Sequence, residues 1–293
     1  MRISTFKDAR YFQILFQSIF LAFGIVYLGW KAEWWLYATY FAVSIATQTL
    51  FEFSRGGQSL RKRLQFSLPS VLISSFGLSL LLKTSYIEVA ALAAFISIAS
   101  KFILRINGKH IFNPSALGIV TAILFTGKAW FSPGQWGSST IILFGVGCLG
   151  VIVVTKIQKL DTSLAFLITF SSLLFIRQII YLGWPIDFFV QSISTGSLLL
   201  FSFFMITDPK TTPNHRMARI LWSMLIAASA FYLVTFKFIN GAPVWVLVLL
   251  QPLVPLFDKA FTDKRFEWKK PPCRQMTALT RHPECLDKYA LRQ

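Results

Sequence analysis

Long apolar segments separated by short polar ones make up most of this chain. A helix needs about 20 apolar residues to cross the hydrocarbon core of a bilayer, so runs of this length predict membrane-spanning helices. The pattern predicts about ten of them, at residues 11–30, 35–53, 66–82, 87–104, 112–127, 139–156, 162–181, 186–207, 217–236 and 243–261. The expected fold is all-α, and the short connections make most consecutive helices antiparallel neighbours.

The composition agrees with an integral membrane protein. Hydrophobic residues make up 55% of the 293 residues and charged residues only 14%, whereas soluble domains carry about 25% charged residues. Several tryptophans stand near the predicted span ends, where amphipathic rings collect at membrane interfaces. They are Trp30, Trp34, Trp35, Trp130, Trp136, Trp184 and Trp245.

Lysine and arginine are distributed unequally between the two sets of predicted loops. Alternate loops and both termini are rich in them, whereas the opposite loops hold only Lys31, Lys83, Lys128 and Lys237, with Arg177 near one rim. By the positive-inside rule, the basic loops and both termini face the cytoplasm. The net charge of +17 follows from this asymmetry and does not indicate nucleic-acid binding. We expect a transmembrane domain over residues 1–262 and a basic cytoplasmic tail over residues 263–293.

Prolines near the predicted span starts suggest an internal repeat. They mark the third and fifth spans on the inner side and the eighth and tenth spans on the outer side, as Pro69, Pro114, Pro185 and Pro243. A five-plus-five inverted repeat would produce this placement. Proline is also common at helix starts in general, where its missing N–H has no intrahelical partner, so both interpretations stay open.

The predicted span interiors are polar in places but carry no charge near the bilayer midplane. The deep polar groups are neutral: Gln17, Thr47, Gln48, Ser97, Ser100, Thr121, Ser171, Ser172, Gln191, Ser194, Thr195 and Gln251. They can serve helix–helix hydrogen bonding. Alternatively, the cluster around Gln191 and Thr195 lines a polar path or a cofactor pocket. A proton relay through buried carboxylates is disfavoured because the interiors lack them.

Two Asx-Pro steps stand next to basic residues at the ends of apolar segments. Asn113-Pro114 follows the basic stretch that contains Arg105 and Lys109, and Asp208-Pro209 ends the eighth span. Proline pushes the residue before it toward extended geometry, so Asn113 can cap the helix that Pro114 begins. The Asp208 carboxylate can pair with Lys101, Arg105 or Lys109. Both steps are either well-made helix ends or a cytoplasmic-side site that attracts an anion or a polar cofactor head.

Common catalytic and metal-binding motifs are absent from the sequence. His110 and His215 stand in the two Asx-Pro stretches without a nearby set of ligands, and the spacing of Cys273, His282 and Cys285 fits no common zinc pattern. Catalytic triads, P-loops and dinucleotide fingerprints are also missing. We therefore expect no metal site and no catalytic residue of these kinds.

The segments SKFILRINGKHIFNPSALG and STGSLLLFSFFMITDPKTTP resemble the RnfD/NqrB family, and so does the ending VLVLLQPLVPLFDKAF. The resemblance covers roughly residues 60–265 and rests on motif residues that include Phe112, Pro114, Gly118 and Pro209. Members of this family are flavin-carrying membrane subunits of ion-pumping electron-transfer complexes. The resemblance implies a ten-helix inverted repeat similar to ammonium and urea channels, in the inner membrane of a bacterium.

The chain departs from the family at the loop that follows the Asn-Pro helix. Typical members carry FMN esterified through its phosphate to the Thr of a Ser-Gly-Ala-Thr motif, which this chain lacks. Ser138, Ser139 and Thr140 offer hydroxyls there without the Gly-Ala pair, so covalent FMN on Thr140 is not expected. The short loop GKAWFSPGQWGSST resembles that of the divergent UnbU-like branch.

Two functions from different classes remain open. The first is a membrane subunit of an Rnf- or Nqr-like complex that couples electron transfer to ion movement, beside other redox subunits. It would use noncovalent flavin (FMN or riboflavin) or a quinone, with Asn113, Asp208, Lys109, Arg105, Gln191 and Thr195 as candidate cofactor-binding residues. The second is a small-solute channel or carrier on the same fold. A scaffold for partner subunits is a third possibility, and whether the subunit is itself catalytic stays open.

Overall fold

The computed structural model describes residues 8–30, 33–56, 60–106, 108–132, 151, 154–155, 159–264 and 266. The first half of this region holds α1 (Ala9–Val26), α2 (Trp34–Ser54), α3 (Leu60–Leu81), α4 (Ile87–Ile103) and α5 (Pro114–Thr126). The second half holds α7 (Leu160–Phe175), the π-helix η2 (Ile176–Tyr181), α8 (Ile186–Ile193), α9 (Gly196–Leu200), the π-helix η3 (Phe201–Met205), α10 (Arg216–Lys237), α11 (Ala242–Leu250), the 3₁₀ turn η4 (Gln251–Leu253) and α12 (Val254–Ala260).

Helices occupy every predicted apolar segment that lies within the described residues. Five helices or helical runs are long and apolar enough to cross a membrane: Ala9–Val26, Leu60–Leu81, Leu160–Tyr181, Arg216–Lys237 and Ala242–Ala260. The bent pair Ile186–Ile193 and Gly196–Met205 would make a sixth. The chain is therefore a mainly helical, multi-pass membrane protein. Ten spans stay a prediction, because segment 139–156 lies almost wholly outside the described residues and α5 has only 13 residues.

Two of the predicted spans are not continuous helices. The eighth is broken between α8 and α9 by a bend of 47°, where Thr195 takes an extended conformation with ψ of 131°. The tenth is interrupted by the 3₁₀ turn at Gln251–Leu253. Pro252 lies within this turn and has no N–H to donate to the preceding turn, which accounts for the interruption. Both breaks lie in the half of the chain that carries Asp208.

Two very short antiparallel strand pairs also occur in an otherwise helical fold, and the apolar pattern did not predict them. Strands β1 (Leu82–Thr84) and β4 (Ala129–Phe131) join the ends of α3 and α5. Strands β2 (Arg105–Ile106) and β3 (Lys109–His110) form a hairpin before α5. Its turn contains Gly108 with φ of 77°, a conformation that favours glycine. The hairpin brings the basic stem of the first Asx-Pro stretch back toward Asn113.

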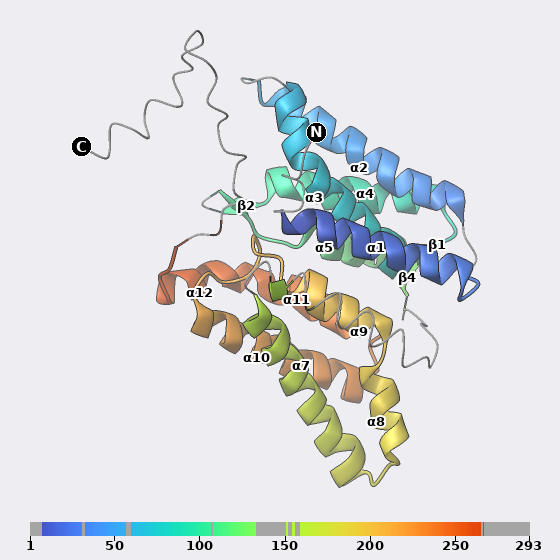
Figure 1. Cartoon of the computed structure of the whole chain (residues 1–293), viewed down its shortest axis with the longest axis vertical. Helices are drawn as coiled ribbons and strands as arrows, with labels where there is room; N and C mark the ends of the chain where they lie inside the picture. The colour runs from blue at the N-terminus through green and yellow to red at the C-terminus, as the bar shows by residue number, and fades with distance from the viewer. Residues whose placement is uncertain are drawn as a thin grey trace.

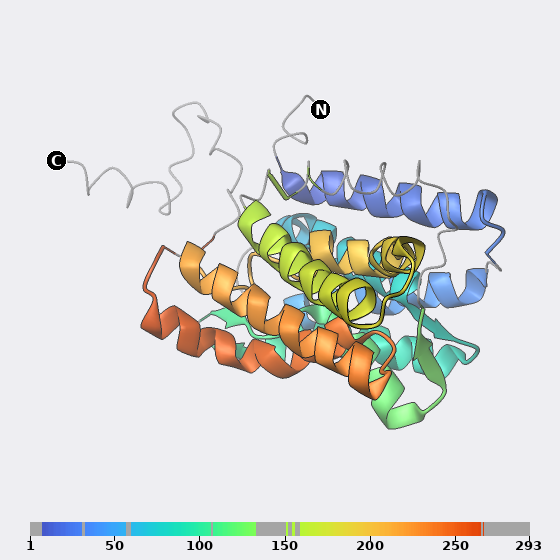
Figure 2. The ribbon, with the colours of Figure 1, turned by 90° about the horizontal axis from the view of Figure 1, so that it is seen from below.

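The helices form two groups that meet near the middle of the molecule (Figure 1). In the first group α2 and α5 both pack against α4, and in the second α7 and α11 both pack against α10. Figure 2 shows α7 and α10 lying side by side. The groups touch where α5 contacts α11. Both Asx-Pro steps stand at this junction, since Asn113 precedes α5 and Asp208 follows η3.

Small residues let α4 and α5 approach closely. A Cβ atom at Gly118 would lie 2.6 Å from the carbonyl oxygen of Ala93 and 3.0 Å from the Cβ of Ser97. Neither neighbour can move cheaply, because the first is backbone and the second is bonded directly to it. Close approach through small residues is the usual way in which membrane helices pack. Gly118 is therefore needed for the position of α5, and with it for the position of Asn113.

Candidate functional site

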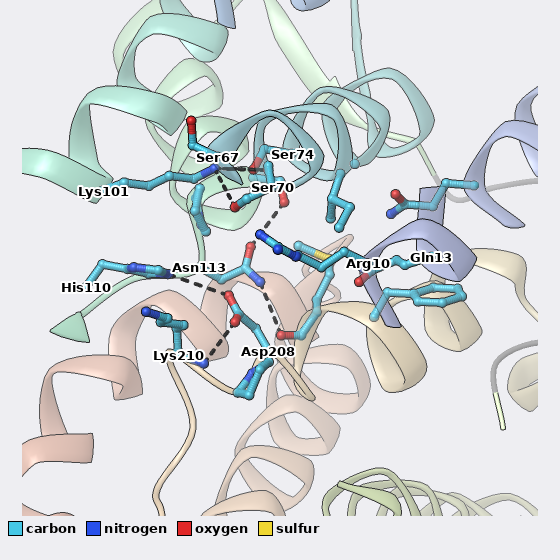
Figure 3. A pocket seen from close by; sticks show the side chains of 18 of the residues that line it. Arg10, Gln13, Ser67, Ser70, Ser74, Lys101, His110, Asn113, Asp208 and Lys210 are labelled. Atoms are coloured by element: carbon cyan, nitrogen blue, oxygen red, sulfur yellow. Dashed lines mark hydrogen bonds and ion pairs between the residues drawn. The ribbon is translucent and has the colours of Figure 1, made fainter. Parts of the chain in front are cut away.

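A cavity of about 250 Å³ lies between α1, α3, the end of α4 and the two Asx-Pro steps. Figure 3 shows polar side chains from these elements around it. Its polar lining includes Gln17 from α1, Ser70 and Ser74 from α3, Lys101 from α4, and Asn113 and Asp208. Lys210 and Arg10 also line it, and Arg10 is paired with Asp8 at 2.6 Å. The cavity stands at the basic end of the helices, the side that the charge distribution assigns to the cytoplasm.

Asn113 holds three helical segments together at this cavity, namely α5, η3 and η4. Its Oδ1 accepts hydrogen bonds from the backbone N–H of Ala116 at 3.2 Å and from the Ser115 hydroxyl at 3.1 Å, which confirms the predicted cap of α5. Its Nδ2 donates to the Met205 carbonyl at the end of η3 at 3.2 Å. Its backbone N–H donates to Oε1 of Gln251 in η4 at 2.9 Å. Asn113 is thus both a helix cap and a tie between the two helical groups.

Asp208 pairs with His110 and with none of the basic residues that the sequence suggested. Its Oδ2 lies 3.9 Å from Nε2 of His110, and its Oδ1 accepts from the backbone N–H of Lys210 at 3.0 Å. Burial raises the pKa of Asp208, but hydrogen bonding and charge from His110, the Lys210 N–H and the charge of Lys101 outweigh it. The net pKa lies below the ordinary value, so this carboxylate is ionised at neutral pH.

Lys101 is buried and is held by α3 instead of by Asp208. Its Nζ donates to the Ser70 carbonyl at 3.1 Å, the Ser70 hydroxyl at 3.2 Å and the Ser74 hydroxyl at 3.0 Å. All three ammonium protons therefore have acceptors. The serines of α3 fix the geometry of Lys101, and in its protonated form it can act on a bound molecule through its charge.

Lys109 lies outside this cavity and ties the second Asx-Pro loop to the last helix. Its Nζ donates to the Thr212 carbonyl at 2.7 Å and to Asn214 Oδ1 at 3.3 Å, and it pairs with Asp258 at 3.0 Å. The Asn214 N–H donates to the other oxygen of Asp258 at 2.8 Å. Of the three basic residues offered as partners of Asp208, Lys109 therefore pairs with another carboxylate, that of Asp258.

Arg105 stands at the rim of the cavity. Its Nε donates to the Lys101 carbonyl, and its guanidinium lies 5.4 Å from the centre of the Phe102 ring. Partial desolvation beside its neighbours lowers its pKa first of all, the charge of Arg55 lowers it further, and Glu52 opposes the shift. Arg105 is an exposed residue, so its charge acts at the entrance to the cavity.

Gln191 and Thr195 are not among the residues that line this cavity. Gln191 is an exposed residue of α8, and Thr195 stands half-buried at the break before α9. The polar cluster of the eighth span and the Asx-Pro cavity are therefore separate features. Of the motif residues, Pro114 and Pro209 line the cavity, and Phe112 packs partly buried against the core.

Several lining residues were not among the sequence candidates. Gln13 and Gln17 are spaced by four residues on α1, and Ser67, Ser70 and Ser74 are spaced by three and four on α3. Polar residues at helical spacing within apolar segments were the available signal. In isolation this signal also fits helix–helix contacts, so only the positions of the helices distinguish the two uses.

The covalent-flavin candidate Thr140 lies outside the described residues, as do Ser138, Ser139 and the cysteines. In the part of the chain that the structure describes, no group of three or more His, Cys, Asp or Glu side chains is arranged to hold a metal ion.

A second charged cluster stands at the start of α7. The Asp161 carboxylate accepts from Nη2 and Nε of Arg219 at 2.6 and 3.0 Å. Lys159 is buried beside this pair and donates to the Pro213 carbonyl at 3.3 Å. Burial lowers the pKa of Lys159 to about 7, helped by repulsion from Arg219 and Lys109 and opposed by Asp161 and Asp258.

Lys159 is expected to make the stability of the protein rise with pH. Its amine has an ordinary pKa near 10.4 in the unfolded chain. Between pH 7 and 10 Lys159 is therefore protonated in the unfolded state but largely neutral in the folded state. The cost of charging Lys159 is fully present below pH 7 and is relieved as the pH rises. The free energy of unfolding should increase by roughly 1 kcal/mol per pH unit from pH 7 to 9. Thermal unfolding at both pH values measures the increase, and an equal increase in Lys159→Met would contradict its assignment to this lysine.

The comparison with protein families agrees with this architecture. The model of the NQR2, RnfD, RnfE family matches residues 121–267, half of the 293-residue chain. The match includes the Asp208-Pro209 step, the broken eighth span and Gln251, and it begins just beyond Asn113. No curated protein matches the chain. With its multi-pass helical fold and this match, the chain belongs to the NQR2, RnfD, RnfE family.

Proposed function

We propose that this protein is the membrane subunit of an Rnf- or Nqr-like complex in the inner membrane of a bacterium. In this proposal it takes part in electron transfer coupled to ion movement and binds flavin (FMN or riboflavin) or a quinone noncovalently. Family membership supports a membrane subunit of this general kind. The observation that carries the cofactor proposal is the cavity at Asn113 and Asp208, which is lined by buried polar and cationic groups.

The lining residues fit a polar ring system with both donors and acceptors. Gln17 is only 4% exposed and lines the cavity, yet its Oε1 has no hydrogen-bond partner among the described residues. A buried acceptor without a partner costs about 1–3 kcal/mol, so a donor on a bound molecule would be stabilising here. Protonated Lys101 favours electron-rich carbonyl groups at the cavity, whereas the charge of Arg10 is paired with Asp8 at 2.6 Å. A flavin ring carries both kinds of group, whereas an oxidised quinone offers acceptors only.

Residues around the cavity would position such a molecule and balance its charge. Asn113 fixes the start of α5, and Ser70 and Ser74 fix the Lys101 ammonium. When bound, the flavin or quinone would supply the electron-accepting and electron-donating chemistry. In its protonated form the Lys101 ammonium beside it would stabilise added negative charge without reorganising.

The proposed ten-helix inverted repeat receives support from the helix packing. In the first half the second span packs on the fourth and the fourth on the fifth, as α2 on α4 and α4 on α5. In the second half the seventh predicted span packs on the ninth and the ninth on the tenth, as α7 on α10 and α10 on α11. Equivalent neighbours in two halves are expected of a repeat.

The cofactor proposal is tested by the colour of the purified protein. The full chain, purified in mild detergent, should show a flavin or quinone spectrum, and the pigment should be released by denaturation. A denaturing gel should show no fluorescent band, since the attachment motif is missing. A colourless preparation without extractable flavin or quinone would contradict the redox proposal, and a fluorescent band would show covalent flavin.

Gln17→Leu locates the cofactor within the protein. We expect it to reduce the retained cofactor about tenfold while leaving the cofactor-free protein unchanged or more stable by about 1 kcal/mol, because an unpaired buried acceptor is removed. Gln191→Leu is the matched control, since Gln191 does not line the cavity. Loss of cofactor in the control alone would indicate that the cofactor binds at the eighth span instead.

A small-solute channel or carrier is the second candidate function. The break between α8 and α9 favours it, because discontinuous helices line substrate sites in many transporters. Solute uptake into vesicles containing a colourless, cofactor-free protein would support this candidate over the first.

A further inference from the structure

The neighbouring C-terminal ends of α2 and α4 present two arginines on one aromatic ring. The guanidinium of Arg55 lies 4.6 Å from the centre of the Phe102 ring, and that of Arg105 lies 5.4 Å from it. Phe51 of α2 stacks on the same ring with centroids 4.8 Å apart. The ring is therefore held between the two helices and contacts both guanidinium groups. Cation–π contacts of this kind fix the position of a guanidinium without neutralising it.

Neither guanidinium forms an ion pair with a described carboxylate, although the charge of Glu52 acts on Arg105 from a distance. Glu52 is the nearest acid in sequence, but its carboxylate lies 3.8 Å from Nε of Arg63 and accepts from Gln48 at 3.1 Å. Arg105 uses its Nε on the Lys101 carbonyl, which leaves its two terminal nitrogens for other acceptors. Repulsion from Arg55 contributes to lowering the pKa of Arg105, after burial. The pair therefore has no directly bound anion among the described residues, since Glu52 is engaged by Arg63 and Gln48.

Exposed apolar side chains continue from this pair along the same two helices. Leu50 and Phe53 of α2 are 60% and 72% exposed, and Ile103 of α4 is 67% exposed. In a membrane protein such residues contact lipid chains. A phosphate bound between Arg55 and Arg105 would thus stand directly above an acyl-chain surface.

We propose that Arg55 and Arg105 form a binding site for the phosphate of an anionic phospholipid on the face assigned to the cytoplasm. Guanidinium groups bind phosphate with paired hydrogen bonds, better than ammonium groups do. Basic sites at the cytoplasmic ends of membrane helices bind anionic headgroups in this way. A free phosphate would gain nothing from Leu50, Phe53 and Ile103, and an acidic protein would not need them at membrane depth. The site does not depend on the proposed cofactor.

The test is the thermal stability of the full chain in detergent with added lipid. Phosphatidylglycerol should raise the Tm by about 3 °C, whereas phosphatidylcholine and glycerol phosphate should not. Arg55→Gln and the double variant Arg55→Gln/Arg105→Gln should lose most of this increase. Arg61→Gln/Lys62→Gln is the matched control, because both residues are exposed basic residues of α3 without a described contact to Phe102, and it should keep the increase.

Each other result contradicts the proposal. An equal increase with phosphatidylcholine would indicate general lipid solvation, and an equal increase with glycerol phosphate would indicate a site for free anions. An increase that survives in the double variant but is lost in the control would place the lipid site on α3. If the pair instead binds an acidic partner protein, the variants would lose that partner and still respond to phosphatidylglycerol. Arg55 does not line the cofactor cavity, so Arg55→Gln separates this site from the cofactor proposal.

Discussion

Replacing Asp161 by alanine is expected to lower the free energy of unfolding by roughly 3–5 kcal/mol, the usual cost of removing one partner from a buried ion pair. The side chains of Asp161 and Arg219 are only 9% and 12% exposed. Without Asp161 the Arg219 guanidinium would keep the Asn214 carbonyl at 2.5 Å as its acceptor, beside the buried amine of Lys159. Asp161 Oδ1 also accepts from the Thr162 N–H at 2.9 Å at the start of α7, and this contact would be lost too.

Chemical or thermal unfolding in detergent measures this loss, and a double variant controls for the charge. Asp161→Leu/Arg219→Met removes both charges and should recover much of the stability, because neither is left buried alone. If Asp161→Ala costs less than about 1 kcal/mol, as an exposed ion pair would, the pair is solvated and does not hold α7 to α10.

Asn113→Ala is expected to have the largest effect on the candidate site. The change leaves the Met205 carbonyl without its donor and the Ala116 N–H without its cap. A lost cap costs about 1 kcal/mol and each buried group left unpaired about 1–3 kcal/mol. We expect the protein to lose roughly 2–4 kcal/mol of stability together with most of its bound cofactor. Unfolding in detergent and the extracted cofactor per mole of protein are the two measurements.

Two further variants separate the structural role of this site from its functional role. Asn113→Ser keeps a side-chain oxygen that can cap α5 and loses the donation to Met205, so it should lose less stability than Asn113→Ala. Asp208→Asn keeps the size of the side chain and its acceptor for the Lys210 N–H, but removes the charge that faces His110. A folded Asp208→Asn protein without cofactor would favour a functional carboxylate. Full cofactor content in both variants would show that the two Asx-Pro steps serve only as helix ends and do not bind the cofactor.

Part of this site could be predicted from the sequence because the relevant interactions are local. The cap that Asn113 forms on the helix starting at Pro114 involves residues at most three positions apart. The preference of proline for the first helical turn is equally local. The position of Asp208 at the end of an apolar run also follows from neighbouring residues.

The partners of the charged residues could not be predicted in the same way. Asp208 faces His110 across 98 positions of sequence, and Lys109 binds Asp258 across 149. The sequence offered several basic residues near each acid, and charge alone does not select among them. The β2–β3 hairpin makes the selection, since it places His110 toward Asp208 and Lys109 toward α12.

The sequence by itself determined that this is a multi-pass helical membrane protein, where its helices lie along the chain, and which residues cap α5. These properties follow from apolar length and local hydrogen bonding. Only the tertiary structure decided that Gln17, Ser70, Lys101, Asn113 and Asp208 enclose one cavity, and that Gln191 and Thr195 stand apart from it. The reason is that polar side chains in apolar helices look alike in sequence, and their use depends on which helices pack against which. That packing rests on close contacts between different helices, such as that of Gly118 in α5 against Ala93 in α4.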